Sequence, residues 1–489
     1  MDFNNYMAYE LVKKVKNRDI ELVELIHTVF ERIEKTEDKV HSFINIYKED
    51  ALNKAQRLDK RLKNEEKVGR LCGLPIGVKD LISIKNKPTT CGSQILKGYN
   101  PPFNATVIQK LVEEEDAIVI GSTNMDEFAM GSSTENSSYG PTYNPWDLSR
   151  VPGGSSGGSG SSVAAGQVSA SLGSDTGGSI RCPASYCGVT GLKPTYGRVS
   201  RYGLIAYANS LDQIGPISAC VYDAALLLEL MAGYDNKDST SVKIPVKPYT
   251  NHLKENIKGK KIGIPEEFFG EGLEKAVKKH TNNTISILEE LGVKIIHLSL
   301  PHLEYSIPTY YLIAMSEASS NLARYDGLRY GKMMEQTSGD IFETFSRTRK
   351  EYFGKEVRRR ILLGTYALSA GYYDEFYMKA LKTRTLIKND FQEAFKKCDV
   401  LVSPTMPTTA FKIGELVEDP LEMYLMDILT CPINLAGLPA LSIPCGFDNS
   451  SLPIGFQLIG NYFDEKTILN IGYKLEQQLN VYKKKPPIS

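Results

Sequence analysis

Two glycine- and serine-rich segments carry the residues of this chain best suited to nucleophilic chemistry. They are residues 153–159 (GGSSGGS) and residues 173–181 (GSDTGGSIR). A serine hydroxyl can become a nucleophile, and consecutive glycines expose backbone N–H groups that can bind an anion. Such composition is also typical of flexible linkers. The tracts alternate with apolar pieces such as 163–165 (VAA) and 189–192 (VTGL), which a linker does not need, so we interpret them as tightly packed, buried backbone.

Two of the three chemistries compatible with these segments are poorly supported. A phosphate-binding loop lacks the Lys-Ser/Thr pair of a P-loop, and no GxGxxG follows a clear strand. A nucleophile elbow matches formally at Gly153-x-Ser155-x-Gly157. That mechanism needs a downstream histidine as general base. The available histidines fall in connecting segments, a charged helix or an apolar strand, where a surface or structural role is the better interpretation: His252, His280, His297 and His302.

The third chemistry is serine-dependent acyl transfer with lysine as the general base. A desolvated, neutral lysine can accept the proton of a serine hydroxyl. Lys79 directly follows an apolar strand expected at residues 74–78, where an ammonium would be partly stripped of water. Taken alone, a lysine at a strand end is more often a solvated surface residue. The glycines at 177 and 178, ahead of Ser179, leave room for a substrate carbonyl beside backbone N–H groups and favour the catalytic interpretation.

The elements around these residues indicate an α/β fold. Apolar residues at helical spacing predict that residues 1–70 form an N-terminal helical segment packed on the core, with a charged helix at 48–63. Residues 71–489 are predicted to form a single large α/β domain, a central mixed β-sheet covered by helices on both faces. Strand, helix and strand at 261–264, 273–291 and 293–296 form an expected βαβ unit. Further helices are expected at 106–115, 354–368, 373–397 and 465–479, and further strands at 117–120, 399–402, 440–443 and 454–458.

Composition narrows the class of protein. The 489 residues carry 58 Lys+Arg against 58 Asp+Glu, and this net charge of +0 argues against a general cationic grip on nucleic acid. The 8 cysteines form no CxxC and read as reduced thiols of a cytosolic protein, without a zinc site. No apolar signal-peptide core and no window of 18 apolar residues is present, so we expect a cytoplasmic, bacterial-type location, with an organelle not excluded.

The order and spacing of Lys79 and the two glycine/serine segments resemble the amidase signature family. That resemblance implies a Ser–cis-Ser–Lys triad. By motif, Ser179 corresponds to the nucleophile, Ser155 to a bridging serine in a cis peptide, and Lys79 to the base. The oxyanion hole corresponds to backbone N–H groups around Thr176, Gly177, Gly178 and Ser179.

Further segments narrow the resemblance to one branch of this family, the A subunits of glutamyl-tRNA(Gln) amidotransferases. They are 124–131 (NMDEFAMG), 144–153 (NPWDLSRVPG), 191–200 (GLKPTYGRVS) and 210–216 (SLDQIGP). The resemblance implies a glutaminase that supplies ammonia to a B subunit, which uses ATP and Mg²⁺ to amidate misacylated tRNA. It also implies a small C subunit that braces the glutaminase against B in a heterotrimer. It implies no metal or cofactor in this chain.

The same resemblance nominates groups for the zwitterionic end of glutamine. Arg359 corresponds to the carboxylate ligand and Asp427 to the ammonium ligand, with Tyr310 nearby. Arg359 belongs to an arginine run at 358–360, so a solvated role is the alternative and the choice among the three arginines stays open. Asp427 lies in the apolar stretch 423–429, where a surface charge is unexpected.

Two alternative functions remain open on the sequence. One is a stand-alone amidase of the same family that acts on small amides, and the other is an inactive scaffold, against which the presence of all three triad candidates counts. The acceptor, glutamyl-tRNA(Gln), aspartyl-tRNA(Asn) or both, is left open because that choice would lie in the partner.

Overall fold

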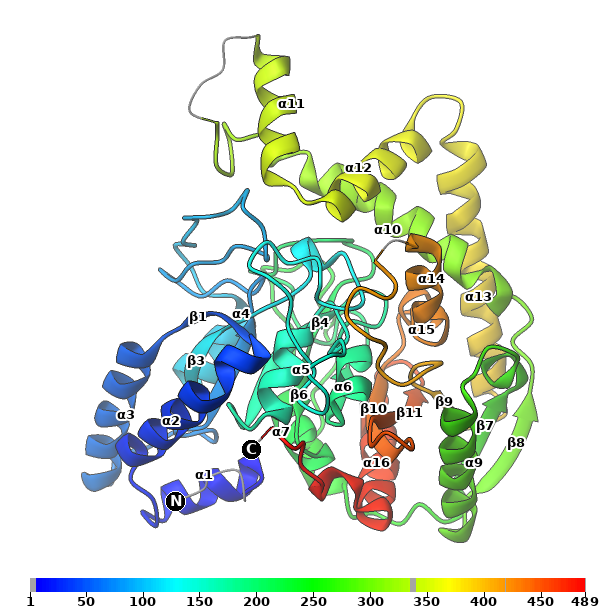
Figure 1. The fold of residues 1–489 in the computed structure, drawn as a ribbon. Helices are drawn as coiled ribbons and strands as arrows, with labels where there is room; N and C mark the ends of the chain where they lie inside the picture. The colour runs from blue at the N-terminus through cyan, green and yellow to red at the C-terminus, as the bar shows by residue number, and fades with distance from the viewer. Residues whose placement is uncertain (1–5, 335–339, 418, 489) are drawn as a thin grey trace.

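A single large mixed β-sheet organises the molecule (Figure 1). The computed structural model describes residues 6–334, 340–417 and 419–488. Within that part of the chain the sheet has 11 strands in the order β1-β3-β2-β4-β6-β5-β10-β11-β9-β7-β8. In chain order the strands are β1 (Phe43–Ile46), β2 (Pro75–Lys79), β3 (Ile118–Thr123), β4 (Ala170–Asp175), β5 (Thr190–Lys193), β6 (Gln213–Ser218), β7 (Lys261–Pro265), β8 (Lys294–Leu298), β9 (Val400–Pro404), β10 (Ala440–Phe447) and β11 (Pro453–Gly460).

Helices pack on this sheet, and a group of them, coloured yellow-green to yellow, lies above it in the view of Figure 1. They are α1 (Ala8–Lys16), α2 (Leu22–Val40), α3 (Lys48–Lys63), α4 (Thr106–Ile108), α5 (Gly157–Ala164), α6 (Arg181–Cys187), α7 (Val221–Met231), α8 (Tyr249–His252), α9 (Lys275–Glu290), α10 (Ser306–Leu322), α11 (Ile341–Tyr352), α12 (Lys355–Leu368), α13 (Lys379–Phe395), α14 (Pro420–Leu425), α15 (Cys431–Ala436) and α16 (Glu465–Leu479).

Helices α6 and α16 cover opposite faces of the sheet at β11. Gly455 of β11 faces Ser185 of α6, whereas Leu458 faces Gly472 of α16. Positions three apart on a strand point to opposite faces, so one helix lies on each side. Both faces are therefore buried, and β11 and most of β10 lie in the core, as a doubly covered sheet requires. The predicted fold class is confirmed.

The expected βαβ unit is confirmed by β7, α9 and β8, because β7 and β8 pair in parallel. The expected helix over 106–115 is only partly α-helical: α4 covers three residues and continues as a π-helix over Gln109–Glu114. In the N-terminal segment, β1 follows α2 and pairs antiparallel with β3, so this segment adds a strand to the shared sheet. The division of the chain at residue 70 stays a prediction.

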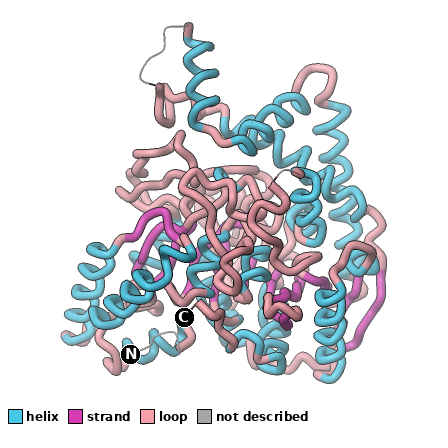
Figure 2. Tube along the Cα trace, viewed as in Figure 1, coloured by secondary structure: helices cyan, strands magenta, loops and turns pink. Residues whose placement is uncertain are grey.

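The two glycine/serine segments adjoin α5, β4 and α6, which lie near the centre of the molecule in Figure 1, and Figure 2 shows that loops are abundant in this region. The first leads into α5, and the second joins β4 to α6. All residues of α5, β4 and α6 are buried. Buried backbone at this density explains the choice of glycine and serine, because larger side chains would not fit between the packed elements.

Candidate active site

The end of β2 and the turn before α5 meet at Lys79 and Ser155. The Lys79 Nζ atom lies 2.7 Å from the Ser155 Oγ atom. The peptide bond between Gly154 and Ser155 is cis, as the resemblance implies for the bridging serine. The Ser155 carbonyl accepts a hydrogen bond of 3.2 Å from the Asp126 N–H group, which holds this turn in place from the other side.

Lys79 is fully buried, and within the described residues its amine makes no direct ion pair. Its second hydrogen-bond partner is the Ser174 hydroxyl at 2.9 Å. Burial lowers the pKa of Lys79 to about 7, although the carboxylates of Asp126, Asp175 and Asp212 oppose this shift. Near neutral pH a large fraction of Lys79 is therefore unprotonated and can accept a proton from Ser155.

Ser179 lies in the turn between β4 and α6. It is buried but not completely so, because 7% of its surface remains exposed to solvent. Its carbonyl accepts a 3.3 Å hydrogen bond from the Ser156 N–H group, which fixes the turn next to the bridging serine. Among the hydrogen bonds of the described residues, none uses the backbone N–H of residues 176–179 as donor. These four N–H groups are therefore free to bind an oxyanion beside Ser179.

Gly177 and Gly178 are required by close packing. A Cβ atom at Gly177 would overlap the phenol end of Tyr310, and one at Gly178 would overlap Thr430. Gly178 also has a φ of +149°, a backbone conformation that residues other than glycine rarely adopt. The Thr430 hydroxyl donates a 2.6 Å hydrogen bond to the Gly177 carbonyl. This bond gives the Gly177 carbonyl a partner within the protein.

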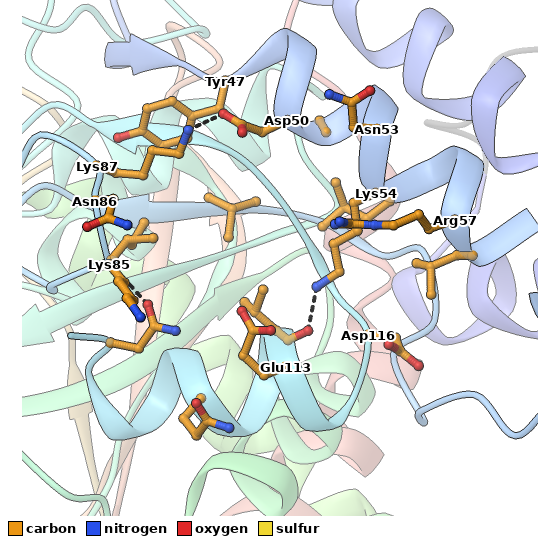
Figure 3. A pocket seen from close by; sticks show the side chains of 18 of the residues that line it. Tyr47, Asp50, Asn53, Lys54, Arg57, Lys85, Asn86, Lys87, Glu113 and Asp116 are labelled. Atoms are coloured by element: carbon orange, nitrogen blue, oxygen red, sulfur yellow. Dashed lines mark hydrogen bonds and ion pairs between the residues drawn. The ribbon is translucent and has the colours of Figure 1, made fainter. Parts of the chain in front are cut away.

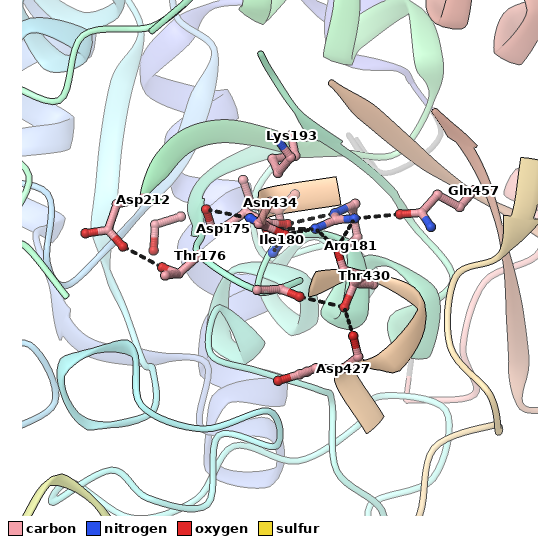
Figure 4. A network of polar contacts seen from close by, with 12 residues as sticks. Asp175, Thr176, Ile180, Arg181, Lys193, Asp212, Asp427, Thr430, Asn434 and Gln457 are labelled. Carbon is pink, nitrogen blue, oxygen red and sulfur yellow. Dashed lines mark hydrogen bonds and ion pairs between the residues drawn. The ribbon is translucent and has the colours of Figure 1, made fainter. Parts of the chain in front are cut away.

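A buried arginine behind the turn ties it to three other elements (Figure 4). Arg181, the first residue of α6, makes two hydrogen bonds of 3.0 Å to the Asp175 carboxylate. The guanidinium also donates to the Thr430 carbonyl at 3.1 Å, to Gln457 Oε1 at 2.7 Å and to Asn434 Oδ1 at 2.5 Å. The network is completely buried, so it fixes the nucleophile turn relative to β11 and α15.

The pKa values of two carboxylates beside the turn are shifted in opposite directions. Burial disfavours the charge of Asp175, but Arg181 outweighs it and lowers the pKa of Asp175 to about 2. Burial raises the pKa of Asp212 to about 6, although its hydrogen bonds and the more distant charge of Arg201 oppose this shift. Asp212 accepts a 2.7 Å hydrogen bond from the Thr176 hydroxyl, which anchors the first residue of the expected oxyanion hole.

The three residues nominated to bind glutamine differ in how deeply they are buried. Asp427 is 6% exposed and sits three residues before Thr430. Its two oxygens accept hydrogen bonds from Ser132 (3.0 Å) and from the Tyr311 hydroxyl (2.7 Å), and burial raises its pKa to about 6. Tyr310 is buried against Gly177. Arg359 is more peripheral: its side chain is 30% exposed and pairs with Glu356.

Several residues of the site were not anticipated from the sequence. Ser174 contacts Lys79, and its place at the start of the SDTGGS tract was the available signal. Ser132 and Tyr311, the two donors to Asp427, carried no signal because each lies far from Asp427 in the chain. Arg360, the buried neighbour of Arg359, could not be told from the other arginines of its run.

Three of the four histidines considered for a nucleophile elbow have other neighbours in the structure. His252 pairs with Glu255 at 2.5 Å and His302 with Asp390 at 2.9 Å. His280 packs beside Gly446. In the described part of the chain, no group of three His, Cys, Asp or Glu residues could hold a metal ion, and no helix is long and apolar enough to cross a membrane.

A groove of about 820 Å³ lies apart from these residues, between α3, the loop at 84–87 and the π-helix after α4 (Figure 3). Its cations are partly engaged: Lys54 donates to the Val112 carbonyl, and Lys87 pairs with Asp50. None of the nominated site residues lines this groove. We assign it no function.

The fold, together with the contact between Lys79 and Ser155 next to the Ser179 turn, is consistent with an amide-hydrolysing enzyme. A family model described as amidase matches residues 24–469. The chain therefore belongs to the amidase family.

Its relatives include a narrower group. The chain is 54% identical over 486 residues to the A subunit of the glutamyl-tRNA(Gln) amidotransferase from Thermoanaerobacter pseudethanolicus, covering 99% of both chains. The crystal structure of the corresponding glutamyl-tRNA(Gln) amidotransferase A subunit from Thermotoga maritima has 42% identity and a TM-score of 0.83, covering 100% of this chain and 99% of that one. A crystal structure of an amidase has 29% identity and a TM-score of 0.82, covering 97% and 100%.

Proposed function

We propose that this chain is the glutamine-hydrolysing component of a tRNA-dependent amidotransferase, an amidase that supplies ammonia for the conversion of glutamyl-tRNA(Gln) to glutaminyl-tRNA(Gln). The observation that carries the proposal is the buried contact of 2.7 Å between Lys79 and Ser155, beside the Ser179 turn. Full-length similarity to A subunits supports the narrower assignment.

In the first half-reaction, the Ser179 Oγ atom attacks the side-chain amide carbon of glutamine. Its proton passes to the Ser155 hydroxyl, which gives its own proton to neutral Lys79. The amide oxygen becomes an oxyanion and is bound by the N–H groups at 176–179. The relay then returns a proton to the leaving nitrogen, the carbon–nitrogen bond breaks, and ammonia departs from the γ-glutamyl ester of Ser179.

In the second half-reaction, a water molecule gives a proton to the same relay and attacks the ester carbon. The carbon–oxygen bond to Ser179 breaks, glutamate leaves, and the serine regains its proton. Asp427 binds the substrate ammonium and Arg359 the carboxylate, with Tyr310 alongside Gly177. A carboxylate with a pKa of about 6 is ionised at neutral pH, as ammonium binding requires.

The proposed function includes two partner subunits, B and C. Ammonia is used by a B subunit that consumes ATP and Mg²⁺, and a small C subunit braces this chain against B in a heterotrimer in the cytoplasm. This chain itself holds no cofactor. Acceptor tRNA is contacted mainly through the B subunit, in keeping with the net charge of +0.

The experiment that tests this function measures ammonia release from glutamine by the chain alone, with B and C subunits, and with both partners plus acceptor tRNA and ATP. We expect glutamine hydrolysis that rises when the partners and the tRNA are added. Rapid hydrolysis of simple aliphatic or aromatic amides by the chain alone, with no response to partners, would instead establish a stand-alone amidase.

A further inference from the structure

One buried carboxylate, Glu356, pairs both with Arg359, which is nominated to bind the substrate's α-carboxylate, and with the neighbouring Arg360. Glu356 Oε2 pairs with Arg359, and its Oε1 atom accepts a 2.7 Å hydrogen bond from Arg360 Nε. Spacings of three and four residues place both arginines on the face of α12 that carries Glu356. The Arg359 guanidinium is therefore oriented by the same group that holds Arg360.

Arg360 in turn contacts the tyrosine that hydrogen-bonds to Asp427. Its guanidinium lies 5.3 Å from the ring centres of both Tyr311 and Tyr424, which stack on each other with centroids 4.0 Å apart. It also donates a 2.8 Å hydrogen bond to the Tyr207 hydroxyl. These contacts hold the Arg360 guanidinium in place, and the ring of Tyr311 packs between this cation and the ring of Tyr424.

Tyr311 connects Arg360 to Asp427, the residue nominated to bind the substrate ammonium. Its hydroxyl donates a 2.7 Å hydrogen bond to Asp427 Oδ2, while the Tyr424 hydroxyl donates to Glu356 Oε1 at 2.9 Å. The contacts thus run without a break from Arg359 through Glu356, Arg360 and Tyr311 to Asp427. Arg360 is only 3% exposed, and a buried ion pair is costly to desolvate, so an apolar core would serve stability at least as well.

We propose that Glu356 and Arg360 are positioning residues that hold Arg359 and Asp427 at a fixed separation, so that the site selects amides bearing both a free α-ammonium and an α-carboxylate. This inference rests on the proposed function. Neither residue touches the reacting atoms. Each acts through the residue that it orients, and their loss changes substrate recognition more than the chemical step.

The test compares competitive inhibition by glutamate, which has both charged groups, with inhibition by glutarate, which lacks the ammonium. Arg360→Met, Tyr311→Phe and Glu356→Gln are prepared in the full chain with the B and C subunits. Arg347→Met is the matched control, because Arg347 is an exposed arginine of helix α11 that pairs with Glu343, one helical turn earlier.

We expect Tyr311→Phe and Arg360→Met to raise the KM for glutamine and the inhibition constant of glutamate by about tenfold, the effect of losing one hydrogen bond to a charged group. The inhibition constant of glutarate and kcat should change less than about twofold. Glu356→Gln should weaken both inhibitors, because it also releases Arg359, and Arg360→Lys should recover part of the loss.

Equal weakening of glutamate and glutarate in Tyr311→Phe, or no change in either, would overturn the proposal. If Arg360→Met does not fold, Tyr311→Phe decides, since it removes a single hydroxyl. Failure of the proposed function looks different: the wild-type enzyme would then not hydrolyse glutamine at all.

Discussion

Lys79 and Ser155 are 76 residues apart in sequence, yet the amine and the hydroxyl lie 2.7 Å apart in a fully buried site. The strand β2 delivers one and the turn before α5 delivers the other. A lysine in this environment is poised to exchange a proton near neutral pH, which an exposed lysine is not. The activity proposed for the chain depends on this contact and on the turn beside it.

Replacing Lys79 by methionine should abolish glutamine hydrolysis, with a loss of at least about 10³-fold in kcat, because the serine relay has no other base. The apolar side chain fills the same buried space without a charge, so the folded structure should survive. Ammonia release and circular dichroism check the two parts. An unfolded product, or activity that persists, would indicate that Lys79 has a structural role.

The pH dependence of kcat/KM should report the titration of Lys79. Its pKa of about 7 means that the base is protonated and inactive at low pH, so kcat/KM should rise with pH and level off above about 7. Asp427, with a pKa of about 6, adds a second protonation that inhibits at still lower pH. A rising limb centred near 10, the ordinary value for lysine, would contradict the assignment.

Substitution of Gly177 by alanine should lower kcat by about 10²-fold or more, comparable with the loss of an oxyanion-hole donor. The added methyl would overlap Tyr310, and the turn would have to move away from the substrate. Gly259→Ala is a suitable control, because its Cβ meets open space, although its φ of +83° makes it slightly destabilising. Steady-state kinetics of both variants make the comparison.

Removal of the buried cation behind the turn should cost stability as well as activity. Arg181→Met leaves the Asp175 carboxylate buried without its ion pair, and breaking such a pair typically costs about 3–5 kcal/mol. The double variant Asp175→Leu/Arg181→Met should recover much of that stability but not the activity, because the turn loses its anchor. Urea denaturation followed by ammonia assays distinguishes this outcome from simple additivity of the two losses.

The parts of the site that could be predicted from the sequence are those whose residues are close together in a motif. Ser179 and its glycines form one continuous turn, and Lys79 ends a recognisable apolar strand. The contacts around Asp427 could not be predicted in this way, because Ser132 and Tyr311 reach it from distant segments, and Arg360 acts on its charge from a third. Only the fold brings these residues together.

The same distinction holds for the fold. The βαβ unit at β7, α9 and β8 has clear periodicity and short connections, and the sequence predicts it. Strand β4 and helix α5 could not be predicted, because both are buried on all sides and built mainly from glycine, serine and alanine, so neither shows an amphipathic pattern. Helix α10 could not be predicted for a related reason. Its buried residues are spread around most of its circumference, so its sequence shows no clear amphipathic pattern.

The most direct test of the account is to find the covalent intermediate on the nucleophile. The assembled enzyme is mixed with glutamine, quenched in acid within the first turnovers and digested, and the peptide containing Ser179 is examined by mass spectrometry. We predict a γ-glutamyl ester on Ser179 in the wild-type enzyme, and neither this ester nor ammonia release in Ser179→Ala. Ammonia release by Ser179→Ala at a near wild-type rate, or an ester on another residue, would contradict the account.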